Sequence, residues 1–175
     1  MKTRKLLLGI VLSFGFLSHT FADQHGMATT YTASLIPLNN SGVYAQVEVS
    51  LVNGRELMVS INASGLEPGK PHPQHIHGFN KSVTNSTCPT IEADTDGDGL
   101  ISIIEGVPSF GPIILPLVPF NLVDENGNLS YTANFPVRLG DLQPLHKRTV
   151  VIHGLTVNGS YIASLPVACG ELEIM

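Results

Sequence analysis

Three histidines lie within the six residues HPQHIH, at His72, His75 and His77. In a β-strand, side chains alternate between faces, so His75 and His77 would project from one face with their Cα atoms about 7 Å apart. The later segment RTVVIHGL supplies His153. Imidazoles from two neighbouring strands are a suitable ligand set for one transition-metal ion. The alternative is two half-exposed strand histidines and one core histidine. His72, between two prolines, is either a further ligand or a solvated loop residue.

A second motif indicates a different metal. The segment DTDGDGLISIIE, residues 94–105, matches the calcium-loop pattern D-x-D-x-D-G-x₅-E at every required position. Prolines 89 and 108 and Gly106 disfavour flanking helices, so we expect a lone calcium loop rather than a helix-loop-helix sensor. Extracellular modules bind calcium at roughly 10⁻⁴–10⁻³ M. The alternative is a solvated acidic turn. The predicted ligands are Asp94, Asp96, Asp98, the Leu100 carbonyl, Ser102 and Glu105.

The first 22 residues are typical of a secretory signal peptide. Lys2, Arg4 and Lys5 precede an apolar run over 6–17, which is too short to span a bilayer, and Ala22 fits the cleavage position. No later segment reads as a membrane span. We therefore predict a secreted or periplasmic protein with one domain over residues 23–175.

Cleavage after Ala22 would create a third candidate site at the new N-terminus, Asp23-Gln24-His25. A free amine, two amide nitrogens and an imidazole can surround Cu(II) or Ni(II) in a square plane.

Charge restricts the classes of partner. The full chain has a net charge of −5, and removal of the three basic residues of the signal peptide takes it to −8. An acidic domain without a basic cluster is poorly suited to nucleic acids or anionic membranes, so metal cations are the expected partners.

Both cysteines, Cys88 and Cys169, lie in the exported part, where disulfides form and persist. One intramolecular bridge is expected; two free thiols sharing a metal ion is the alternative, although neither lies in a Cys-x-x-Cys motif.

The elements that must position these residues read mostly as strands. Val, Thr, Ile and Tyr tend to alternate with polar residues, and Asn53-Gly54 is a strong hairpin signal. Evenly spaced strands without a long helix indicate an antiparallel sandwich or barrel. The predicted strands are 29–36, 43–52, 55–62, 129–137, 148–155 and 160–173.

The central part, from about residue 78 to 120, is different. Its periodicity fails, and its prolines are expected to break any regular element. The segment VPSFGPIILPLVPF, residues 107–120, is too apolar to remain wholly in water. It is expected to pack over the sandwich, with a partner surface as the alternative.

The segments HIHGF, RTVVIHG and LPVACGELE resemble three signature segments of the copper/zinc superoxide dismutases, in the same order. The resemblance implies a Greek-key β-sandwich with a long central loop insertion. It also implies copper ligands at His75, His77 and His153 and a Cys88–Cys169 disulfide. The first half of the mature chain also resembles the chordin-type (CHRD) domain.

The sequence also departs from the dismutase pattern at several positions. Asp94 stands where the family has its metal-bridging histidine, and no histidine occurs between His77 and His146. Pro166 replaces the arginine that guides superoxide. Zinc is therefore not expected, and fast dismutation is in doubt. Three functions remain open: a copper-dependent superoxide dismutase, a non-enzymatic copper carrier, and a CHRD-like interaction module without catalysis.

Overall fold

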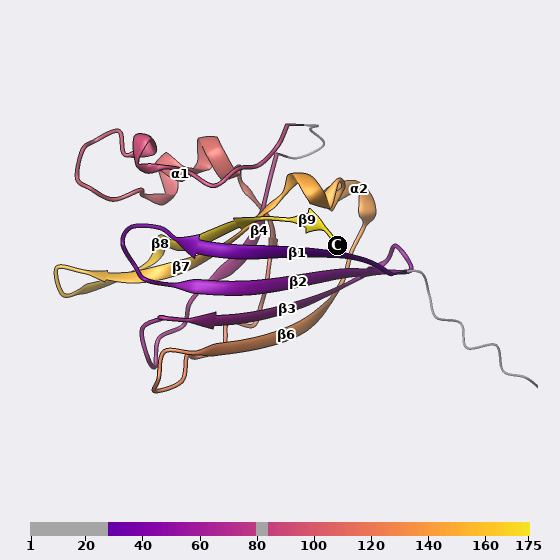
Figure 1. Ribbon diagram of the computed structural model, residues 1–175, viewed down its shortest axis with the longest axis horizontal. Coiled ribbons are helices and arrows are strands. Elements are labelled where there is room, and N and C mark those ends of the chain that lie inside the picture. Colours follow the sequence, from indigo (N-terminus) through magenta and orange to yellow (C-terminus); the bar gives the residue numbers. More distant parts are fainter. Residues whose placement is uncertain (1–27, 80–83) are drawn as a thin grey trace, which may run out of the picture.

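A computed structural model describes residues 28–79 and 84–175 (Figure 1). The predicted signal peptide and the Asp23-Gln24-His25 site lie outside these residues. Within them, no helix combines the length and apolar composition needed to cross a bilayer. The strands are β1 (Ala28–Pro37), β2 (Tyr44–Val52), β3 (Glu56–Ser64), β4 (Gln74–His77), β5 (Ile113–Pro116), β6 (Leu129–Pro136), β7 (Thr149–Val157), β8 (Ser160–Glu171) and β9 (Glu173–Ile174). The helical elements are α1 (Ile103–Phe110), α2 (Leu139–Leu142) and 3-10 turns at Ile91–Ala93 and Leu145–Lys147.

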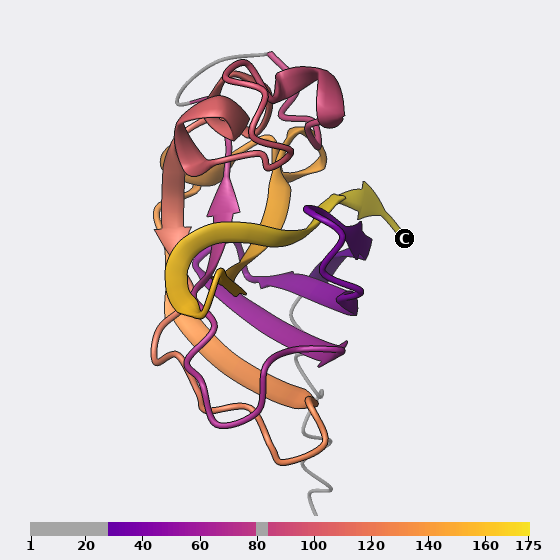
Figure 2. The same ribbon diagram turned by 90° about the vertical axis from the view of Figure 1, so that its left-hand side faces the viewer.

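The strands form one curled antiparallel sheet in the order β5-β4-β7-β8-β1-β2-β3-β6, and β9 pairs with β1. The halves β1-β2-β3-β6 and β5-β4-β7-β8 contribute to a common core (Figures 1 and 2). Connections from β3 to β4, β5 to β6 and β6 to β7 join strands that are not neighbours in the sheet. The predicted all-β Greek-key sandwich is confirmed.

Alternating side chains explain the half made of β1, β2, β3 and β6. In β2 and β3 buried and more exposed residues alternate along the strand, which places one row in the core and the other toward water. Asn53 and Gly54 both adopt positive φ in the β2–β3 turn. Asn158 and Gly159 do the same between β7 and β8, as a tight hairpin turn requires.

Strand β7 is buried on both faces from Thr149 to Gly154. Val150 and Ile152 belong to the main core, whereas Val151 packs with Phe110 in a second cluster. Phe110 belongs to the central part of the chain, residues 84–120, which we call the central insertion. The insertion therefore acts as a cover for the outer face of this half of the sheet.

The prediction that prolines exclude regular structure from residue 78 to 120 is wrong. Ser102 accepts a hydrogen bond from the Glu105 amide, and the Glu105 carboxylate accepts one from the Ser102 amide, which starts α1 with a capping box. Pro108 lies within this short helix, which ends at Gly111 with a φ of 79°. Strand β5 tolerates Pro116 because it lies at the sheet edge.

The segment 107–120 packs on the sandwich as expected. Phe110 and Leu117 are fully buried, and β5 pairs with β4. Ile113 and Val118 remain about half exposed.

Candidate metal centre

His75, His77 and His153 meet on the outer face of the sheet. β4 and β7 are antiparallel neighbours, with Gln74 opposite Ile152 and His75 opposite Val151. Ile76 enters the main core, so the flanking side chains of His75 and His77 face the other way. One potential ligand nitrogen from each of His75, His77 and His153 lies within 4.8 Å of the others. We call these three residues the histidine cluster.

A local irregularity in β7 flanks His153. The pairing of β7 with β8 shifts register on both sides of His153, and Gly154 follows with a φ of 110°. A Cβ atom at Gly154 would collide with the Tyr161 hydroxyl and approach the His72 ring. Only glycine fits this position, because both the backbone angle and the available space exclude a side chain.

Each member of the histidine cluster has one buried ring nitrogen without a hydrogen-bond partner. These atoms are Nδ1 of His75, Nε2 of His77 and Nε2 of His153. A buried polar atom usually finds a partner, because leaving it unpaired costs about 1–3 kcal/mol. Three such atoms in one place indicate a missing common partner, and a metal ion would satisfy all three.

Backbone carbonyls set the orientation of two of these rings. His77 Nδ1 lies 2.9 Å from the Gly111 carbonyl oxygen, and His153 Nδ1 lies 3.0 Å from the Ser164 carbonyl oxygen. In neutral rings the Nδ1–H groups donate these bonds, which leaves a lone pair on each Nε2. Metal-binding histidines are typically held by such a second bond.

Burial keeps the cluster uncharged. It lowers the pKa of His153 to about 3, helped by the charges of His75 and His77, and lowers the pKa of His75 to about 4, helped by the charge of His77. The pKa of His77 is also lowered by burial. The three rings are therefore neutral near pH 7, the form in which imidazole binds a metal ion.

Two aromatic rings support the cluster from the central part of the chain. Phe110 contacts the His77 ring at a centroid distance of 4.6 Å, and Phe120 contacts His75 at 5.7 Å. These residues and the carbonyls of Gly111 and Ser164 are not evident from the sequence. No residue pattern marks a carbonyl that becomes an acceptor only after distant segments pack.

His72 does not join the cluster. Its Nδ1 lies 3.0 Å from the His153 carbonyl oxygen and its Nε2 lies 3.2 Å from that of Glu67. The ring is almost wholly buried rather than solvated. His72 therefore contacts the backbone of a cluster residue, with both nitrogens already facing acceptors, and it is not positioned as a fourth ligand.

A cleft of about 340 Å³ reaches His75 and His153. Pro166, which replaces the arginine expected from the dismutase resemblance, pairs with His153 in the β7–β8 ladder. Among the described residues that line this cleft there is no lysine or arginine.

The acidic loop, residues 94–105, forms a separate group. One carboxylate oxygen from each of Asp94, Asp96 and Asp98 lies within 4.8 Å of the others, on the protein exterior. Asp94 accepts hydrogen bonds from the amides of Gly97 and Gly99 at 2.8 and 2.9 Å. It belongs to this group and not to the histidine cluster.

Glu105 is oriented by the same loop. Its carboxylate accepts hydrogen bonds from the Thr95 amide and hydroxyl at 2.8 and 2.9 Å and from the Ser102 amide at 2.9 Å. Bonds from Ser102 and then Thr95 lower the pKa of Glu105 to about 2. Of the residues predicted to bind calcium, Asp94, Asp96 and Asp98 lie close together, and Glu105 is bound to the same loop through Thr95 and Ser102. The loop is followed by α1 and preceded by a 3-10 turn.

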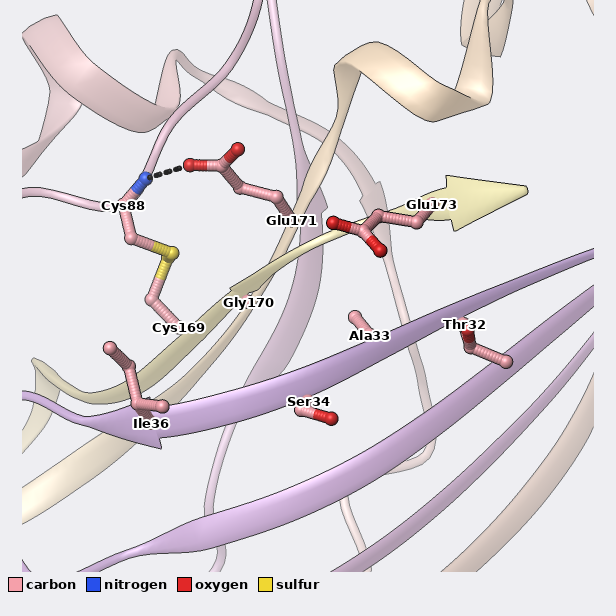
Figure 3. A pocket seen from close by; sticks show the side chains of 9 residues that line it. All are labelled: Thr32, Ala33, Ser34, Ile36, Cys88, Cys169, Gly170, Glu171 and Glu173. Atoms are coloured by element: carbon pink, nitrogen blue, oxygen red, sulfur yellow. Dashed lines mark hydrogen bonds between the residues drawn. A yellow bond between two sulfur atoms is a disulfide. The ribbon is translucent and has the colours of Figure 1, made fainter. Parts of the chain in front are cut away.

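The disulfide between Cys88 and Cys169 joins the central insertion to β8, across 81 residues. Cys169 is fully buried, and the Cys88 amide donates to the Glu171 carboxylate at 3.3 Å (Figure 3). The alternative of two thiols sharing a metal ion is therefore wrong, because both sulfurs are bonded to each other.

Comparisons with known proteins give structural neighbours only. No family model matches the chain, and no curated protein matches it. Superoxide dismutase 5 of Candida albicans with Cu(II) is 13% identical and has a TM-score of 0.46, with 85% of this chain and 94% of that chain covered. A superoxide dismutase-like protein from Bacillus subtilis is 16% identical with a TM-score of 0.49, covering 81% and 97%. The clock protein EA4 is 16% identical with a TM-score of 0.48, covering 83% and 94%.

Proposed function

We propose that this protein binds one copper ion through His75, His77 and His153. Two observations carry this proposal: each ring has one buried nitrogen without a partner, and one potential ligand nitrogen from each ring lies within 4.8 Å of the others. Imidazole suits copper, zinc and nickel, and copper(II) is bound most tightly among the divalent ions of its row. The neutral state of the rings and the carbonyls behind His77 and His153 favour metal binding without rearrangement of the strands.

Copper supplies one-electron redox chemistry when bound, and the protein determines what reaches it. The strands hold the three rings, and the carbonyls of Gly111 and Ser164 direct the His77 and His153 lone pairs toward the ligand position. The cleft at His75 and His153 allows a small molecule to approach. The proposed catalytic activity is superoxide dismutation, at a rate below that of the copper/zinc superoxide dismutases. No cationic side chain among the cleft-lining residues would attract the superoxide anion.

A non-enzymatic copper carrier is the second candidate, favoured by the absence of lysine and arginine from that cleft lining. The third, an interaction module of CHRD type whose histidines are structural, does not account for three unpartnered nitrogens. A dismutation assay on copper-loaded protein separates the first two candidates.

Metal analysis of the purified chain tests copper binding. We expect one copper ion per chain, and we expect zinc not to displace it. In His153→Ala the affinity for copper should fall at least 100-fold, because loss of an outer-shell partner alone lowers metal affinity about 10–100-fold. His146→Ala is the matched control, because His146 is exposed in the 3-10 turn before β7. Equal copper binding by wild type and His153→Ala would contradict the proposal.

We also propose that the acidic loop binds calcium, through Asp94, Asp96, Asp98, the Leu100 carbonyl, Ser102 and Glu105. The support is the full match to the loop pattern together with the proximity of the three aspartates. Calorimetry at millimolar calcium should give a binding signal that Glu105→Gln weakens and Glu92→Gln, in the preceding 3-10 turn, preserves. No heat and no rise in melting temperature of the wild-type protein at millimolar calcium would contradict calcium binding.

We further propose that residues 1–22 are cleaved and that the mature protein is secreted or periplasmic. The disulfide supports this, since such bonds persist in oxidising compartments. Mass spectrometry of the mature N-terminus tests the cleavage site and, with it, the premise of a copper or nickel site at Asp23-Gln24-His25.

A further inference from the structure

The cleft above the histidine cluster has mostly apolar walls. Its apolar lining residues are Ile103 from α1, Ile113 from β5, Phe120, Pro73 and Ala163. Two rings of the cluster, His75 and His153, reach the same space. A cavity of about 340 Å³ with apolar walls and few polar groups is typical of sites for small organic molecules.

Charge is absent from this lining. Of the described residues that line the cleft, none is Asp, Glu, Lys or Arg, and Ser164 is the one side chain with a hydroxyl. A metal ion at the histidine cluster would attract a donor atom of either an anion or a neutral molecule. The part of the ligand that remains in the cleft, however, meets apolar walls, where a charged group loses water without gaining a partner.

We infer that the cleft selects small uncharged molecules that combine one metal-binding donor atom with an apolar body, in preference to anions. This inference rests on the copper site proposed above, and it implies that superoxide, an anion, reaches that site less readily than an uncharged molecule. Burial of an apolar group against Ile113 and Phe120 strengthens such a complex by roughly fourfold in affinity for each CH₂ group. An inorganic anion gains nothing from these walls.

Two pyridines test the walls separately from the metal. 4-Methylpyridine and isonicotinate share the same donor nitrogen, but the group opposite that nitrogen is a methyl in one and a carboxylate in the other. Copper-loaded protein is titrated with each, and binding is followed by electron paramagnetic resonance and visible absorption of the copper. We expect the wild type to prefer 4-methylpyridine about tenfold more than free copper does.

Variants then place a cation in the wall. Ile113→Lys and Ala163→Lys alter exposed residues that line the cleft, whereas Ile104→Lys alters an exposed residue of α1 that does not line it. At low salt, the preference for 4-methylpyridine should fall about five- to tenfold in either cleft variant and stay unchanged in Ile104→Lys. Using two cleft variants keeps the test valid if one of them does not fold.

The outcomes distinguish the two proposals. Wild-type protein that binds no copper removes the copper site and this inference with it. Wild-type protein that binds copper, but prefers isonicotinate as strongly as free copper does, overturns this inference alone. The same follows if the cleft variants and Ile104→Lys change the preference equally.

Discussion

The histidine cluster and the acidic loop are both metal-binding patterns in the sequence, but they differ in burial and in hydrogen bonding in the structure. The histidine cluster is built on two paired strands and keeps three buried nitrogens unpartnered. The acidic loop is exposed, and its carboxylates already accept hydrogen bonds from the amides of their own turn. Without metal, the buried nitrogens of the histidine cluster lack hydrogen bonds and lower the stability of the protein, whereas most carboxylates of the acidic loop already have hydrogen-bond donors. A metal should therefore change the stability of the protein more through the histidine cluster.

Loss of the disulfide should have the largest effect. Cys88→Ser with Cys169→Ser is expected to lower the free energy of unfolding by about 4 kcal/mol, because a loop of this length is no longer closed in the unfolded chain. Hydrogen exchange should show greater loss of protection in the insertion that bears the acidic loop than in β4 and β7. Equal loss across both regions would contradict a specific role of the disulfide in holding the insertion to the sheet.

Acid should weaken the metal-free protein through the histidine cluster. The folded-state pKa values of His75 and His153, about 4 and about 3, lie below the ordinary value of 6.5. Between pH 6.5 and these folded-state values the unfolded chain binds more protons, so stability is highest above pH 6.5 and falls as the pH decreases to 4 for His75 and to 3 for His153. A loss of roughly 3 kcal/mol between pH 6.5 and 4.5 is expected from urea unfolding.

His153→Gln is the control for this effect, because the free energy of unfolding of this variant should change less with pH. A stability that does not change with pH over that interval would show that the rings are not buried in neutral form. Glu105 of the acidic loop should contribute little in this window, because its pKa changes from the ordinary 4.5 to about 2, so its contribution is lost only below pH 4.5.

Gly154→Ala should disturb the histidine cluster at a smaller cost. The new methyl group meets the Tyr161 hydroxyl and requires a strained backbone, with an expected loss of about 2 kcal/mol. Gly159→Ala is the matched control, since Gly159 also has a positive φ but open space around its Cα. Only Gly154→Ala is expected to weaken copper binding, measured by competition with a chelator.

The smallest effect is expected at the helix cap. Ser102→Ala removes one half of the capping box of α1 and should cost about 1 kcal/mol in thermal or urea unfolding. Because the acidic loop ends at this cap, calcium affinity should fall as well, while copper affinity should not. Weakened copper binding in this variant would show that the two regions are coupled through α1.

Much of the fold follows from local patterns that the sequence displays. Alternation in 43–52 predicts β2, and Asn53-Gly54 predicts its turn, because strand faces and positive φ angles depend on neighbouring residues. Sequence reasoning misses α1 and β5, and α1 shows why. Pro108 and Gly106 argue against a helix locally, but the capping box at Ser102 and burial of Phe110 outweigh them.

By itself, the sequence determined which residue types could bind metal and which strand face His75 and His77 share, since both depend on short-range periodicity. Only the tertiary structure decided that His153 joins them and that His72 does not. It also decided that carbonyls of Gly111 and Ser164 direct two rings, and that apolar walls surround the approach. These relations join residues 34 to 81 positions apart or depend on backbone atoms that every residue has, so no local pattern encodes them.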